Sequence, residues 1–171
     1  VHTSGALPLA ALGGVAERTG VLYPLQTFSD DRAVDWSEVP LLIEGSEATT
    51  TELLTALAAR LSEHVHPVRS EQRRQLHLAA VFACNFTNHL LLIADEVMRG
   101  VDLDPTLLHP LVRETFEKAL TIGPEAAQTG PARRNDVGTM RWHEASLAAR
   151  PELLELYRTL SERIQKNEGL R

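Results

Sequence analysis

The sequence predicts an α+β fold, in which a remnant of a parallel sheet is followed by an all-helical region. Short aliphatic runs at 1–3, 21–25 and 41–44 are typical of buried strands. From residue 49 onward the apolar residues follow a helical period, and no further strand is expected. We place the boundary near residue 68, which gives an α/β portion at 1–68 and a helical portion at 69–171.

Composition and net charge limit the kinds of molecule that the protein is expected to bind. The net charge is −6 and no Lys/Arg-rich run occurs, so we expect neither a nucleic-acid partner nor an anionic membrane surface. The apolar stretches look too short and too interrupted to span a bilayer. Cys84 is the single cysteine, which excludes a disulfide within the chain and favours a reducing, cytoplasmic location. The first residues resemble a strand entering a turn, with neither an initiator Met nor a signal peptide, so we expect that sequence precedes them.

The α/β portion is predicted to contain a parallel strand–helix–strand unit. A short helix over 7–19 would follow the first strand, although Gly13 and Gly14 weaken it. A second, amphipathic helix is expected over 49–64, with leucines at helical spacing. A parallel sheet this small needs more strands, which again predicts sequence upstream.

The helical portion begins with a predicted long helix over 70–99. Ser70 is the candidate N-cap, and Gly100 ends the helix. Its middle is apolar on nearly all sides, which predicts burial within a domain or between the subunits of a homodimer. Asp104-Pro105 predicts the start of a second helix that ends at Gly123. The segment 123–136 is expected to be irregular, and two more helices follow, at about 136–149 and 151–169.

Polar residues form one arc on the long helix. At about 100° per residue, Arg74, His77, Cys84, Asn85 and Asn88 lie within roughly 80° of one another. Buried polar groups need partners. The arc therefore predicts a structural hydrogen-bond network at a helix contact, a solvated groove, or a substrate cleft in which His77 and Asn85 are catalytic residues.

A second polar segment runs from Thr129 to Asp136. Its turn residues lead into a helix N-terminus, whose free N–H groups attract anions. With Arg134 the segment would bind a small anionic molecule through Thr129, Arg134 and Asp136. A structural connector in which Asp136 is only a cap explains the same residues.

Two further patterns concern cofactors and metals. Thr3, Ser4 and Gly5 follow the first strand, where ligands lie in open α/β sheets, so they form either a cofactor-binding turn or an ordinary turn capped by Ser4. His64 and His66 lack a third ligand at useful spacing, so no metal site is expected.

Five motifs in order resemble one family, over essentially the whole chain: HTSG (2–5), YPLQTFS (23–29), IEGS (43–46), HLAAVFACNFTNHL (77–90) and QTGPARRND (128–136) with His143. The chain is similar to Rossmann-like proteins with a C-terminal helical domain of unknown function. These resemble pyrroline-5-carboxylate reductase, the deazaflavin-dependent NADP oxidoreductases and the 6-phosphogluconate dehydrogenase group. Where the family has Arg-Gly-Asp, this chain has Asn135, which also tolerates a left-handed turn.

The resemblance implies an NADP-dependent oxidoreductase that acts on a small carbonyl, imine or hydroxy acid and dimerises through its helical domain. It also implies that His77 and Asn85 face Thr129, Arg134 and Asp136 across a cleft. No G-x-G-x-x-G occurs, so NADP binding is expected for a longer protein only. The long helix has no Lys, the acid/base residue of many relatives. A non-catalytic nucleotide- or metabolite-binding regulatory dimer is therefore the alternative, and a pure dimerisation module is the third interpretation.

Overall fold

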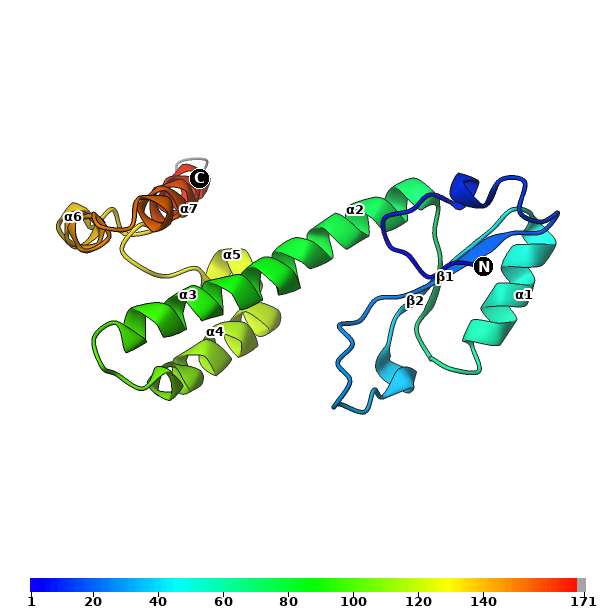
Figure 1. The fold of residues 1–171 in the computed structure, drawn as a ribbon, viewed down its shortest axis with the longest axis horizontal. Coiled ribbons are helices and arrows are strands. Elements are labelled where there is room, and N and C mark those ends of the chain that lie inside the picture. The colour runs from blue at the N-terminus through cyan, green and yellow to red at the C-terminus, as the bar shows by residue number, and fades with distance from the viewer. Residues whose placement is uncertain (169–171) are drawn as a thin grey trace. The chain divides into compact units, whose positions relative to one another are not determined.

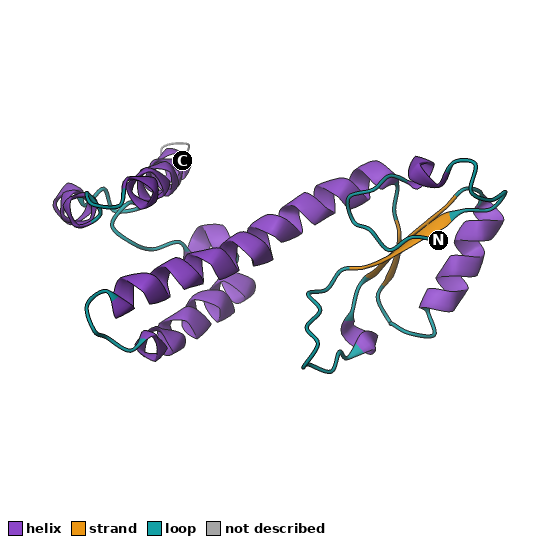
Figure 2. Cartoon of the chain, viewed as in Figure 1, coloured by secondary structure: helices purple, strands orange, loops and turns teal. Residues whose placement is uncertain are grey.

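The computed structural model describes residues 1–168 and confirms the α+β fold (Figures 1 and 2). It contains two compact units, one formed by residues 1–97 and the other by the residues from Met98 onward. The sheet ends at Pro67, next to the boundary expected near residue 68. That domain boundary stays a prediction, because the compact units divide within the last turn of the long helix.

The sheet has three strands in the order β1-β2-β3: β1 (Gly20–Pro24), β2 (Leu41–Gly45) and β3 (Val65–Pro67). The first two strands match the predicted strands, but β1 is antiparallel to β2. The predicted parallel pairing of these strands is therefore wrong. The segment between them contains only a 3₁₀ turn, η2 (Trp36–Glu38), and not the α-helix that usually forms the crossover between parallel strands.

The predicted strand at 1–3 is reduced to one parallel bridge. His2 pairs with Val21, through N–H···O bonds of 3.1 Å to Gly20 and from Leu22. The helix predicted over 7–19 is wrong, because only the 3₁₀ turn η1 (Leu9–Leu12) forms. Gly14 adopts φ = 77°, which a helix does not allow.

Helix α1 (Ala48–Ala58) packs on β2 and carries the core of this unit. The buried side chains share alternate positions on the strand and one stripe of the helix, namely Val39, Leu41, Ile43, Leu54 and Ala58. The helix ends at residue 58 rather than 64, and the following residues form β3 parallel to β2. The expectation of no strand after residue 49 is therefore wrong, and β2–α1–β3 is the parallel βαβ unit of the chain.

One continuous helix covers residues 70–99, as predicted. It consists of α2 (Ser70–Ala80), a π-helical turn η3 (Val81–Phe86) and α3 (Thr87–Arg99). Ser70 is not its N-cap, because Arg69 occupies that position. The Ser70 hydroxyl instead contacts Glu44 and accepts a hydrogen bond of 2.9 Å from the backbone N–H of Leu9.

The same helix corrects the expectation that every apolar stretch is too short for a bilayer. By length and composition Ser70–Arg99 is able to cross a membrane, with a mean hydropathy of 1.5. A single such helix is weak evidence by itself, and none of its apolar window is buried within the described residues. The absence of a membrane segment stays a prediction.

The second unit is helical in all of its described residues that form regular structure. After the turn η4 (Pro105–Leu108) its helices are α4 (His109–Ile122), α5 (Pro124–Ala127), α6 (Val137–Ser146) and α7 (Pro151–Glu168). The segment expected to be irregular thus contains the short α5. Asp104 and Asp136 cap the helices that follow them, as predicted.

Candidate active-site groove

A groove of about 610 Å³ lies within the first unit, between the end of β1 and one side of the long helix. Its polar lining comes from Tyr23, Gln26, Thr27, His77, Cys84 and Asn85. Its apolar lining comes from Leu25, Leu76, Ala79, Ala80, Val81 and Ala83. The volume matches that of small-molecule sites in proteins. The structure therefore places both predicted catalytic residues, His77 and Asn85, on one concave surface.

Tyr23 and His77 form the most specific contact of the groove. The phenol oxygen of Tyr23 lies 3.2 Å from Nδ1 of His77, and the two rings meet edge to face at 6.1 Å. Both side chains are half-buried. Burial raises the pKa of Tyr23, so its hydroxyl stays protonated at neutral pH. The pair thus joins a neutral phenol to an imidazole, a group suited to proton transfer.

Gly5 brings the 2–5 turn against this pair. A Cβ on Gly5 would lie 2.7 Å from Nδ1 of His77 and 2.8 Å from Cζ of Tyr23, so only glycine fits without displacing them. The Ser4 hydroxyl accepts hydrogen bonds of 3.2 Å from the N–H groups of Ala6 and Leu7. Ser4 is therefore the cap of the turn, and Thr3 is exposed.

A buried polar cluster fixes the start of α2. Arg73 is fully buried and forms an ion pair with Glu44 at the end of β2. It also donates a hydrogen bond of 2.6 Å to the carbonyl of Leu7, and the hydroxyl of Ser70 bonds Glu44. Burial alone would raise the pKa of Glu44, but the bonds from Arg73 and Ser70 lower it overall. The cluster joins the N-terminal segment, the sheet and α2, one turn before His77.

The π-helical turn lies beside the groove and carries Cys84 and Asn85. The Thr87 hydroxyl donates to the carbonyl of Phe82, five residues earlier, at 3.4 Å. Single π turns inside α-helices occur frequently at functional sites. Of the arc predicted on the long helix, His77, Cys84 and Asn85 line the groove, whereas Arg74 and Asn88 do not.

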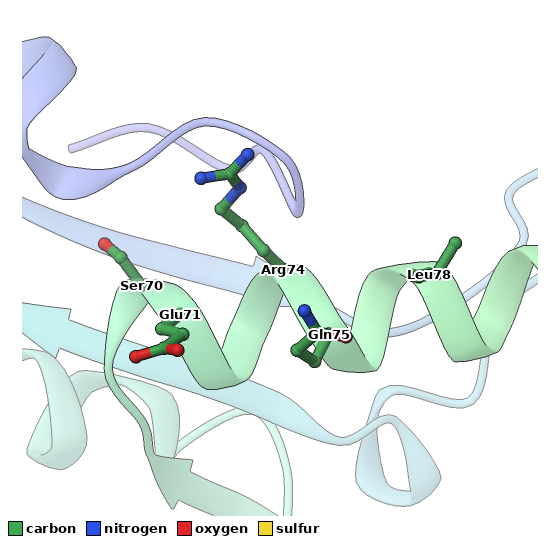
Figure 3. A pocket seen from close by; sticks show the side chains of 5 residues that line it. All are labelled: Ser70, Glu71, Arg74, Gln75 and Leu78. Carbon is green, nitrogen blue, oxygen red and sulfur yellow. The ribbon is translucent and has the colours of Figure 1, made fainter.

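Arg74 instead lines a second pocket, of about 670 Å³, at the start of α2, with Ser70, Glu71, Gln75 and Leu78 (Figure 3). Arg74 and Glu71 point in different directions from the helix, so their charges do not converge on one point. This pocket brings together no proton-transfer pair, and we place the candidate site at Tyr23 and His77.

The other predicted site residues belong to the second unit. Asp136 accepts hydrogen bonds of 3.0 and 2.7 Å from the N–H and hydroxyl of Thr139, and these bonds lower the pKa of its carboxyl. Thr129 and Arg134 are exposed. Asn135 adopts φ = 51°, the left-handed turn expected of it. That Thr129, Arg134 and Asp136 face His77 and Asn85 stays a prediction.

Comparison with known proteins bears on this arrangement. A family model described as Domain of unknown function (DUF2520) matches residues 39–164. The chain belongs to this family. No curated protein matches the sequence.

Two solved structures are similar to the chain. The first is that of the "putative NADP oxidoreductase BF3122" from Bacteroides fragilis, with 42% identity and a TM-score of 0.92 over 96% of this chain. The chain spans 64% of the length of that protein. The second is protein TM1727 from Thermotoga maritima, with 20% identity and a TM-score of 0.79 over 98% of this chain and 68% of the other. The second likeness shows the fold alone.

The residues present fit NADP at the 2–5 turn but not at its phosphates. The 2–5 turn abuts His77, and Nε2 of His2 is buried with no hydrogen-bond partner among the described residues, as expected where another group completes the turn. The phosphates have no counterpart, because the sequence has no G-x-G-x-x-G. That Thr3, Ser4 and Gly5 contact a cofactor stays a prediction.

Sequence reasoning missed Tyr23, Gln26 and Thr27 as site residues. All three lie at or just after the end of β1, where ligands of α/β proteins gather. The motif 23–29, which begins in the predicted strand 21–25 and runs past its end, was the signal that points to them.

Proposed function

We propose that this chain is the substrate-facing part of an NADP-dependent oxidoreductase. Its substrate would be a small carbonyl or imine compound, or in the reverse direction a hydroxy compound. The contact between Tyr23 and His77 in the groove supports this proposal most strongly. The relative from Bacteroides fragilis supports the class of cofactor by its name.

The proposed mechanism assigns one tautomer to His77. In it the Tyr23 hydroxyl, 3.2 Å from Nδ1, donates to that nitrogen, and a neutral His77 carries its own proton on Nε2. His77 then presents an N–H donor from Nε2. A donor of this kind both orients a carbonyl oxygen and supplies its proton. Asn85, on the same groove surface, would provide a second hydrogen bond to the substrate.

The proton and electron balance of the reduction is simple. Bound NADPH supplies one hydride, and thus two electrons, to the carbonyl carbon. The carbonyl oxygen takes the proton from Nε2 of His77 while Nδ1 takes the hydroxyl proton of Tyr23, so His77 stays neutral and Tyr23 regains its proton from solvent. The products are the alcohol and NADP⁺. In the second unit, Arg134 and the N-terminus of α6 remain the proposed site for a small anionic group.

The test uses the complete gene product with NADPH and a panel of carbonyl and imine compounds. His77→Gln should lower kcat by about 10²–10⁴-fold, the usual contribution of a general acid. Tyr23→Phe should lower kcat less and should move the pH profile, because Nδ1 loses its donor. His89→Gln, on the same helix but outside the groove, is the matched control and should leave kcat unchanged.

The alternative is a non-catalytic dimer that binds a nucleotide or metabolite. The absence of Lys from residues 70–99 favours it, because no amine is available as an acid/base group there. NADPH binding without turnover of any compound would support this alternative. Equal turnover by wild type and His77→Gln would exclude His77 as the proton donor.

We also propose that the protein is a homodimer, located in the cytoplasm. Leu78, Phe82, Phe86 and Leu90 follow one another at four-residue spacing on the long helix, and all four are exposed. Such a stripe carries no charge and matches a second copy of itself about a two-fold axis. A second chain is therefore the occupant that best covers it.

A further inference from the structure

Among the residues that the structure describes, those lining the groove include no Lys, Arg, Asp or Glu. Its polar groups are two amides, three hydroxyl- or thiol-bearing side chains and one imidazole. Its remaining surface is aliphatic. A ligand in the groove would thus meet hydrogen-bond donors, hydrogen-bond acceptors and apolar contacts, but no countercharge.

We infer that the groove takes uncharged carbonyl compounds with an apolar substituent, in preference to oxo acids. This inference rests on the proposed function and names its substrate class. The N–H of His77 and the amides of Gln26 and Asn85 satisfy a carbonyl and one neighbouring polar group. The alkyl or aryl part lies against Leu25, Leu76 and the alanines of the helix.

Such a groove offers a carboxylate no compensating positive charge. Moving a carboxylate from water to a partly apolar surface costs free energy unless a cation or several donors compensate. The charged residues of the neighbouring cluster do not help, because Arg73 and Glu44 are already bonded to each other. Arg74 lies in another pocket. Selection against acids therefore follows from charge, without a steric barrier.

The experiment compares matched pairs that differ in charge and by one ester methyl group. The complete gene product is assayed with NADPH and methyl pyruvate against pyruvate, and with methyl benzoylformate against benzoylformate. The esters should show a kcat/KM at least about tenfold higher than the acids, because the carboxylate of each acid loses its hydration on binding. The aryl ester should exceed methyl pyruvate, because it fills the apolar part. Acids preferred over esters would overturn the inference while leaving the oxidoreductase proposal intact, and would favour the anion site at Arg134.

A cation placed in the groove should reverse the preference. Ala79→Arg adds a guanidinium to the lining, and the ratio of ester to acid should fall by about tenfold. Ala56→Arg makes the same change on α1, outside the groove, and should leave the ratio unchanged. An unchanged ratio in Ala79→Arg would contradict the placement of the substrate.

Binding without NADP separates this inference from the oxidoreductase proposal. Saturation-transfer NMR with the same four compounds should show contact for the esters and weaker contact for the acids. That result supports the inference even if no compound is reduced, in which case the oxidoreductase proposal fails by itself. Acid binding equal to or stronger than ester binding, or no binding of either, would overturn the inference.

Discussion

Arg73 is the residue whose loss should damage the first unit most. Arg73→Met keeps an unbranched apolar stem but removes the guanidinium, and with it the ion pair with Glu44 and the bond to the carbonyl of Leu7. The Arg73 side chain is 0% exposed and that of Glu44 is 15% exposed. Removing one partner of a buried ion pair costs about 3–5 kcal/mol. Glu44 keeps its bonds to Ser70, so the lower end, about 3 kcal/mol, is expected.

The two tryptophans allow each unit to be followed separately. Trp36 lies in the first unit and Trp142 in the second. On a Trp142→Phe background, the urea midpoint reported by Trp36 fluorescence should fall by about 1 M or more, given slopes of about 1–3 kcal/mol/M. Arg74→Met, at the exposed neighbouring position, is the control and should cost less than about 0.5 kcal/mol. Equal midpoints for the Arg73 and Arg74 variants would refute the role of the cluster.

Low pH should weaken the stabilising ion pair between Arg73 and Glu44. The pKa of Glu44 is lowered from its ordinary 4.5 in the folded state. Its contribution to stability is therefore complete above about pH 4.5 and is lost as the pH falls through the folded-state pKa. The wild-type midpoint should decline over this range, and the decline should be smaller in Arg73→Met, where Glu44 no longer has its cation.

Three further predictions concern the rest of the chain. Asp136→Ala removes the cap of α6 and should cost about 0.5–2 kcal/mol in urea unfolding followed by Trp142; Asp136→Asn, which keeps the acceptor, should cost less. Phe82→Glu, at the exposed apolar stripe, should convert the proposed dimer to a monomer in light scattering, and a wild-type monomer at micromolar concentration would contradict the dimer. The 171-residue chain should show no NADP affinity by calorimetry, whereas the complete gene product should bind it; tight binding by the chain would place the phosphates near Arg134.

Local signals in the sequence predicted much of the fold. The strands β1 and β2, the extent of the long helix and the caps Asp104 and Asp136 depend on nearby residues, and the structure confirms them. Strand direction depends on the connection between strands, and this is where the prediction failed. The three-residue β3 has too few positions to show a period, and only Val65 in it is partly buried.

Only the part of the site on the long helix was predictable from the sequence. His77 and Asn85 share a helix, so helical spacing brings them together in advance. Tyr23 joins them only because α2 passes the end of β1, a contact across 54 residues that no local pattern encodes. The hydrogen-bond register of residues 81–86 could not be predicted from the sequence either, because a π turn and an α turn use the same residue types.

The π-helical turn at Val81–Phe86 separates the long helix into two segments of different phase. A π turn holds one more residue than the α turn that it replaces, so a helical wheel drawn through it misassigns every later face by about 100°. Deleting one residue here would restore an unbroken α ladder and would leave Thr87–Arg99 facing nearly as it does now, because the π turn takes up the extra residue. The same residues wound as a plain α-helix would instead turn Thr87–Arg99 by about 100° relative to His77, so the π turn decides which face of α3 continues the groove side of the helix.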